Sequence, residues 1–131
     1  MNKIEPYEIL CSELIKPFPD ISKLQKIIMA HPNILDEMFE GETVLNFTLK
    51  NSPNLLSIYF LLSLPVNVNT VNANGESPLQ SAALRSDATA TTALLQTGRI
   101  EKLNEPNPLV RSALNIAVKN KKYDSALAIA Q

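Results

Sequence analysis

The segment Gly41-Glu42-Thr43-Val44-Leu45-Asn46 recurs 34 residues later as Gly75-Glu76-Ser77-Pro78-Leu79-Gln80, and a more diverged third copy is Val110-Arg111-Ser112-Ala113-Leu114-Asn115. A repeat of this length is typical of stacked supersecondary units, each of which buries its apolar face only against its neighbours. The repeat therefore predicts the fold of the chain. It identifies no specific partner.

Within one repeat, the residues predict a turn, a helix cap and a short first helix, in that order. The segment from Val68 to Gly75 is rich in Asn and Gly, which tolerate positive φ, and it predicts an exposed hairpin-like turn. Ser77 is then placed to cap a helix that begins at Pro78, and Thr43 and Ser112 are placed to cap the corresponding helices of the other units. Residues on one face of this first helix are small or apolar: Leu79, Ala82 and Ala83.

A second helix is predicted in each unit. Residues from Leu55 to Ser63 are apolar over most of the helix surface, which predicts burial between neighbours. Its counterpart runs from Thr89 to Gln96, with Gly98 placed to terminate it. In the first unit, the helix around Pro6 to Ile15 is the first helix, and Ile27-Ile28 belongs to the second.

This order of elements resembles the ankyrin repeat, whose signature is a turn, Gly-x-Thr-Pro-Leu-His-x-Ala, a first helix, a Leu-Leu pair and Gly-Ala-x-Val-Asn. The segment from Gly75 to Ala82 matches it with Ser for Thr and Gln for His, and Leu61-Leu62 and Val68-Asn69 match the later positions. Pro65-Val66 replaces Gly-Ala, and the unit at Gly41 lacks the Pro. The resemblance implies an all-α, helix-turn-helix solenoid with short hairpin-like turns. It covers residues 1–131 as one domain, with approximate units 1–40, 41–74, 75–109 and 110–131.

The resemblance also implies a function, because the turns and first helices of ankyrin-like proteins line a concave surface that binds other proteins. We therefore expect a non-catalytic protein–protein interaction module. Exposed Phe39, Phe47 and Ile116 would form an apolar anchor on this surface; in the alternative, Phe39 and Phe47 pack against the neighbouring unit. The candidate partner-binding residues are Phe39, Glu40, Glu42, Phe47, Asn72, Asn74, Glu76, Ser81, Arg85, Asn107 and Ile116.

Charge and composition argue against several classes of partner. Twelve basic residues against thirteen acidic ones leave a net charge of −1, so we expect neither nucleic acid nor a membrane as a partner. The longest apolar stretch, from Leu55 to Leu64, is too short to span a bilayer. The single cysteine, Cys11, forms no internal disulfide and is predicted to be a small core residue, which favours a reducing compartment. We expect a soluble, cytoplasmic monomer.

The residues that enzymes need are sparse. His31 is the only histidine, so neither a pair of histidine metal ligands nor a Ser-His-Asp relay can form, and its position before Pro32 predicts a site just past a helix. Three glycines spread over the repeats make no phosphate-binding loop. We expect no catalytic residue, cofactor or metal. The carboxylates around the first turn are predicted to be solvated and to steer a basic partner, and the basic run near the end of the chain to be solvated. These residues are Asp36, Glu37, Glu40 and Glu42, and Lys119, Lys121 and Lys122.

Two alternatives remain open from the sequence. The apolar segment from Ala126 to Gln131 predicts a chain that is a fragment of a longer protein, or an end that another element covers. The chain would then be the regulatory or targeting portion of a larger protein. Its Asn-, Ile- and Lys-rich composition resembles ankyrin proteins that intracellular bacteria deliver as effectors into the host cytosol.

The first helix carries two further patterns. Pro6-Tyr7-Glu8-Ile9-Leu10 with Leu14 is similar to the opening of an F-box, a helical motif that docks ubiquitin-ligase adaptors, but this match stops early and competes with the repeat register. Charged residues on this helix predict a polar outer face for a terminal unit, and they are Glu5, Glu8, Glu13 and Lys16.

Overall fold

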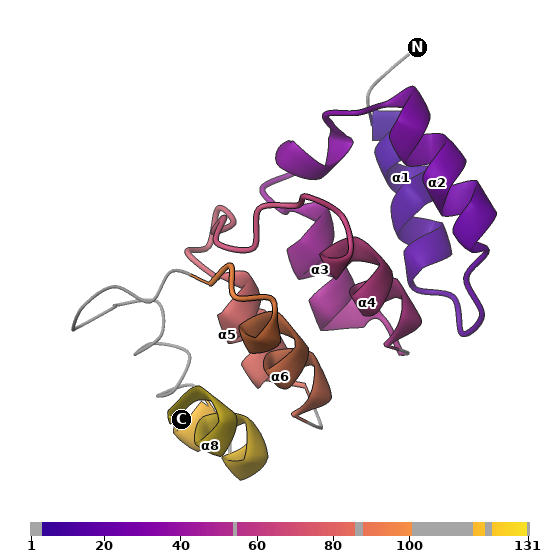
Figure 1. Cartoon of the computed structure of the whole chain (residues 1–131). Coiled ribbons are helices and arrows are strands. Elements are labelled where there is room, and N and C mark those ends of the chain that lie inside the picture. Colours follow the sequence, from indigo (N-terminus) through magenta and orange to yellow (C-terminus); the bar gives the residue numbers. More distant parts are fainter. Residues whose placement is uncertain (1–3, 54, 86–87, 101–116, 120–121, 131) are drawn as a thin grey trace.

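The computed structural model describes residues 4–53, 55–85, 88–100, 117–119 and 122–130, and this part of the chain is helical (Figure 1). It contains no β-strand, only an isolated bridge between Phe39 and Glu42. The predicted all-α class is therefore confirmed. The elements in chain order are α1 (Ile4–Leu14), α2 (Ile21–Ala30), the 3-10 helix η1 (Ile34–Asp36), α3 (Val44–Asn51), α4 (Leu56–Leu62), α5 (Pro78–Ala83), α6 (Thr89–Gln96) and α8 (Tyr123–Ala130).

The helices form pairs that lie next to one another in sequence order. Helix α1 contacts α2, α3 contacts α4, and α5 contacts α6. Successive pairs meet through α1 and α3, α3 and α5, α4 and α6, and α6 and α8. Figure 1 shows these pairs in a row, with the segments that connect one pair to the next along one side. We call the part of that side formed by residues 36–42 and 70–76 the turn edge.

Local sequence signals set the helix ends. The Thr43 hydroxyl accepts a hydrogen bond from the Asn46 N–H at 3.1 Å, which caps α3. Ser77 and Gln80 cap each other's backbone N–H groups at the start of α5, at 3.2 and 2.7 Å. Gly98 adopts a φ of +71° just after α6. These three predictions are confirmed, whereas Ser112 lies outside the described residues.

The core lies between the paired helices. Leu14, Leu49, Leu61 and other large apolar side chains from α1 to α6 are fully buried, and small residues such as Ala83 let α3 and α5 approach closely. The prediction for α4 was wrong in one respect, because the helix is not buried all round: Leu56 is 57% exposed and Tyr59 is 49% exposed.

The second and third units also donate hydrogen bonds to carbonyls at the end of a helix in the unit before them. Helix C-termini leave such carbonyls without a partner inside the helix. The Ser57 hydroxyl donates to the Leu14 carbonyl at 2.6 Å, and Arg85 Nη1 donates to the Leu49 carbonyl at 2.8 Å. The Arg99 guanidinium donates to three carbonyls at and just beyond the end of α4. We call these contacts the inter-unit caps.

Glu13 departs from the predicted polar outer face of α1, since it is 2% exposed. Its carboxylate accepts hydrogen bonds from Lys16 Nζ and the Asp20 N–H, both at 2.8 Å, and lies 3.4 Å from Lys23 Nζ. The Lys16 hydrogen bond, followed by that of the Asp20 N–H, lowers the pKa of Glu13 from 4.5 to about 2. The charged carboxylate therefore ties α1 to α2.

We expect Glu13→Gln to lower the free energy of unfolding by about 1–2 kcal/mol at pH 7, less than the whole pKa shift implies because both lysines are half-exposed. Since the folded-state pKa is depressed, the contribution is complete above pH 4.5 and is lost as the pH falls towards 2. Urea denaturation should therefore show a smaller difference in the free energy of unfolding between wild type and variant at pH 3 than at pH 7. The control is Glu8→Gln on the exposed side of α1; a gap that is equal at both pH values contradicts the assignment.

Candidate functional site

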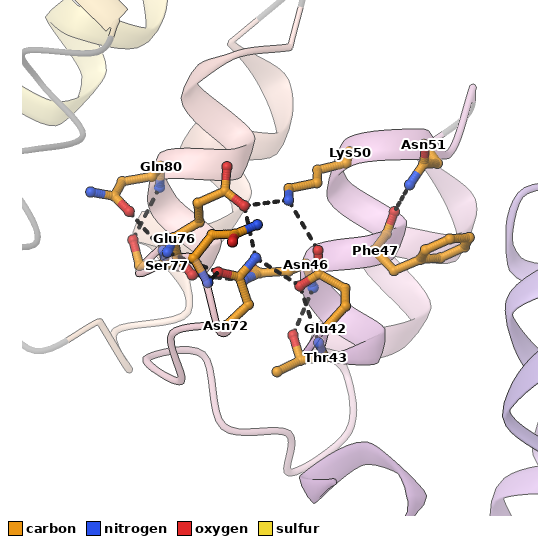
Figure 2. A network of polar contacts seen from close by, with 11 residues as sticks. Glu42, Thr43, Asn46, Phe47, Lys50, Asn51, Asn72, Glu76, Ser77 and Gln80 are labelled. Atoms are coloured by element: carbon orange, nitrogen blue, oxygen red, sulfur yellow. Dashed lines mark hydrogen bonds and ion pairs between the residues drawn. The ribbon is translucent and has the colours of Figure 1, made fainter. Parts of the chain in front are cut away.

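A polar network joins the turn edge to the first helix of one unit (Figure 2). Lys50 Nζ, from the last turn of α3, lies 3.0 Å from Glu42 Oε2 and also binds Glu76 Oε1. Asn72 Nδ2 donates to the same two carboxylates, at 3.0 Å to Glu42 and 2.8 Å to Glu76. Because Glu42 and Glu76 occupy equivalent positions in successive repeats, this network ties the two units together.

The network carries one negative charge in excess, since two carboxylates face one ammonium. The hydrogen bond from Asn72, followed by that from Lys50, lowers the pKa of Glu76. Partial burial lowers the pKa of Lys50, but the hydrogen bonds to Glu76 and Glu42 outweigh burial, so this pKa is raised overall. Lys50 and Glu76 therefore stay charged at neutral pH.

The first turn is a two-residue loop. Phe39 and Glu42 exchange backbone hydrogen bonds of 2.9 and 3.1 Å, and the loop residues Glu40 and Gly41 have φ values of +53° and +79°. Two positive φ values in succession are the pattern of a type I′ turn. Glycine adopts this conformation without strain, whereas glutamate rarely does.

The second turn is built differently, although it occupies the same place in its repeat. The Asn72 N–H donates to the Glu76 carbonyl at 2.9 Å, and the Gly75 N–H donates to the Asn72 carbonyl at 3.0 Å, so three residues form the loop. The Ala73 N–H donates to the Gly41 carbonyl at 2.9 Å and joins the two turns through their backbones. Both predicted hairpin-like turns are present.

On geometry, the turn edge is the candidate site. No protein-family model, curated protein or solved structure matches this chain. In the described residues, hydrogen bonds and ion pairs connect the turns of two consecutive units, and this turn edge has more carboxylates than cations. Such an edge can present charge to a partner without reorganising itself.

The structure divides the predicted partner-binding residues into exposed and internal ones. Glu40 and Asn74 lie exposed at the two turn tips. Two others are buried, which leaves little of their surface for a partner: Ser81 is 3% exposed on α5, and Asn72 is 5% exposed at the centre of the network. Arg85 uses its guanidinium in an inter-unit cap. Asn107 and Ile116 lie outside the described residues.

The predicted apolar anchor is not formed by Phe39. Its ring packs against the Tyr7 ring of α1, with ring centroids 4.3 Å apart, and the side chain is half-buried against the core. Phe47 is also half-buried, and Figure 2 shows its ring on the side of α3 that faces away from the network. Tyr7 and Phe39 both belong to the unit 1–40, so this ring contact lies within one unit, and the alternative in which Phe39 and Phe47 pack against a neighbouring unit stays a prediction.

Sequence reasoning missed Lys50 and misjudged Glu42, which was predicted to be solvated but is a half-buried member of the network. The available signal was the repeat itself. Carboxylates at Glu42 and Glu76 are neighbours in a stack, and a lysine in the last turn of the intervening helix can reach both. Asp36 and Glu40 are exposed, as predicted.

The other residues considered for catalysis or metal binding occupy structural or solvent-exposed positions. His31 follows α2 as its C-cap, as predicted. Cys11 is 5% exposed, and burial raises the pKa of its thiol to about 11, which keeps the sulfur protonated and unreactive at neutral pH. No three His, Cys, Asp or Glu side chains of the described ranges are grouped so as to hold a metal ion. Lys119 is exposed and Lys122 half-buried, while Lys121 lies outside the described residues.

None of the helices that the structure describes has the length and apolar character needed to cross a membrane.

We expect Lys50→Met to lower the free energy of unfolding by about 1–2 kcal/mol at pH 7, since it leaves Glu42 and Glu76 facing each other without a cation. Because the pKa of Glu76 is lowered in the folded wild type, its contribution is complete above pH 4.5, and the loss in the variant should shrink as the pH falls below that value. Urea denaturation measured from pH 7 to pH 4 tests both points. Lys26→Met on the exposed side of α2 is the matched control, and equal losses in the two variants would contradict the role of the network.

Proposed function

We propose that the chain folds as an ankyrin-like solenoid and works as a non-catalytic binding module, whose turn edge receives a basic segment of a protein partner. The row of contacting helix pairs and the two hairpin-like turns support the solenoid. They also place exposed tips from consecutive units side by side, joined through Ala73 and Gly41.

The observation that carries this proposal is the state of Glu40. It is an exposed glutamate with a φ of +53°, and its carboxylate makes no hydrogen bond or ion pair with the described part of the chain. The strained backbone therefore has no compensating contact from that carboxylate within this part of the protein. Strain of this kind is concentrated at functional sites, where stability is lower than it could be.

The charge around Glu40 indicates the chemistry of the partner. The turn edge carries one strongly held cation, Lys50, which reaches in from α3 and is already paired. Lysine or arginine side chains of a partner would complement the carboxylates and speed the encounter at low salt. The carboxylates of this edge are Asp36, Glu37, Glu40, Glu42 and Glu76.

A binding experiment with defined probes tests this proposal. Fluorescence anisotropy would compare a lysine- and arginine-rich peptide with a glutamate-rich peptide of equal length at several salt concentrations. We expect the basic peptide alone to bind, with an affinity that falls as salt rises. Equal binding of both peptides, or of neither, overturns the proposal.

Matched variants locate the binding. Asn74→Lys places a positive charge on the turn edge, and Gln96→Lys makes the same change at the exposed end of α6. We expect Asn74→Lys and Glu40→Gln each to lower the affinity for the basic peptide by about threefold to tenfold, the range for a charge at the rim of an interface. Gln96→Lys should leave this affinity unchanged. An equal effect of Asn74→Lys and Gln96→Lys would place the binding elsewhere.

A further inference from the structure

Asn74 and Gly75 form the only Asn-Gly pair of the chain, at the tip of the second turn. Both residues are exposed. A Cβ placed on Gly75 would have no heavy atom within 4 Å apart from its chain neighbours, so the space beside the Gly75 Cα is open and no side chain of Gly75 shields its nitrogen. An asparagine amide followed by an unhindered backbone nitrogen is the arrangement in which the backbone itself can act as a nucleophile.

We propose that Asn74 is a modification site, at which the side-chain amide converts spontaneously to a carboxylate. The Gly75 nitrogen loses its proton to water and attacks Asn74 Cγ. A Cγ–N bond forms, the Cγ–Nδ2 bond breaks, and the amide nitrogen leaves as ammonia, which gives a five-membered succinimide. One water molecule then opens the ring at either carbonyl, yielding aspartate or isoaspartate. Water is consumed and ammonia is released, and no oxidant or reductant takes part.

Asn72 controls this reaction, because it holds the turn closed. Its carbonyl accepts the Gly75 N–H at 3.0 Å, and its Oδ1 accepts the N–H groups of Asn74 and Glu76 at 2.9 and 3.0 Å. In the closed turn the Gly75 nitrogen is therefore held by this hydrogen bond. The succinimide ring can form only after the turn has opened locally. Since Ala73, Asn74 and Gly75 are all exposed, this opening breaks hydrogen bonds to Asn72 but moves no buried side chain of these three loop residues.

The product would carry a carboxylate at the position that Glu40 occupies in the preceding repeat. The conversion would therefore extend the negative charge of the turn edge from one unit to the next. A gain in affinity for a basic partner rests on the proposed function, whereas the conversion itself does not.

Peptide mass spectrometry of the full chain, incubated at neutral and at mildly alkaline pH, tests the proposal independently of any partner. We expect Asn74 to gain the mass of an amide-to-acid conversion, faster at the higher pH because the attacking nitrogen must lose its proton. Asn67, which is exposed but followed by Val68, is the internal control in the same digest. Conversion of Asn74 no faster than that of Asn67 in the folded protein overturns the proposal.

Two variants test the mechanism. Gly75→Ala adds a methyl group beside the attacking nitrogen and should slow the conversion. Asn72→Ala removes the two hydrogen bonds that Oδ1 accepts within the turn, together with the two that Nδ2 donates to Glu42 and Glu76, and should speed the conversion about tenfold. Should Asn72→Ala not fold, the wild type in urea below its unfolding midpoint replaces it, and its conversion should accelerate with urea. A rate that neither Asn72→Ala nor urea changes overturns the control by Asn72.

Discussion

Replacing Arg99 with alanine is expected to lower the free energy of unfolding by about 2–4 kcal/mol. The guanidinium donates to the Leu64 carbonyl at 2.9 Å, to the Val66 carbonyl at 3.1 Å and to the Leu62 carbonyl. Hydrogen bonds from a charged donor are among the stronger ones, and truncation would remove this donor from all three carbonyls, of which the Leu64 carbonyl keeps the Val66 N–H at 2.8 Å. Urea denaturation followed by circular dichroism measures the loss.

The control for this prediction is Arg99→Lys, which keeps the charge but lacks the planar fork that serves several acceptors at once. We expect this variant to lose about half as much stability as the alanine variant. An alanine variant within about 0.5 kcal/mol of the wild type would show that water replaces the guanidinium at no cost, against the role assigned to Arg99.

Gly41→Ala is expected to cost about 2–3 kcal/mol, for two separate reasons. The φ of +79° is unfavourable for any residue with a side chain, and a Cβ at this position would lie 2.8 Å from the Cβ of Ala73. The first and second turns are in direct contact here, where the Ala73 N–H donates to the Gly41 carbonyl. The added methyl group would therefore push the turns apart.

Gly75→Ala separates the two reasons. Gly75 has nearly the same φ, +78°, but a Cβ there would meet nothing within 4 Å, so we expect a loss of only about 1 kcal/mol. The double variant Gly41→Ala/Ala73→Gly should recover the part of the loss that comes from the contact between Cβ atoms. Equal losses at Gly41 and Gly75 would contradict the close approach of the turns.

The elements of this fold could be predicted from local signals. Helix α6 has the predicted bounds, Thr89 to Gln96, and α4 ends one residue before the predicted end at Ser63. Caps such as Thr43 and Ser77 depend on backbone groups three residues away, and a single repeat contains all that they need. The spacing of the repeats could also be read directly.

The candidate site could be predicted only in part, because its contacts run between units. Glu40 and Asn74 are exposed since they lie at turn tips, which the turn pattern indicates. The burial of Asn72 depends on two carboxylates, one of them 30 residues away. The environment of Glu13 likewise depends on tertiary contacts, since Lys23, in the next helix, approaches its carboxylate. Periodicity assigns a residue to a face but does not identify which distant side chain meets it.

The inter-unit caps all point in one direction along the chain. Donors on Ser57, Arg85 and Arg99 serve carbonyls of the preceding unit, so the ends of α1, α3 and α4 are completed by residues that come later in the sequence. A ribosome delivers the acceptors first and their donors 33 to 43 residues afterwards. During synthesis, therefore, water satisfies the newest helix ends until the next unit emerges, and nascent units should become resistant to protease one after another, each only when its successor is available.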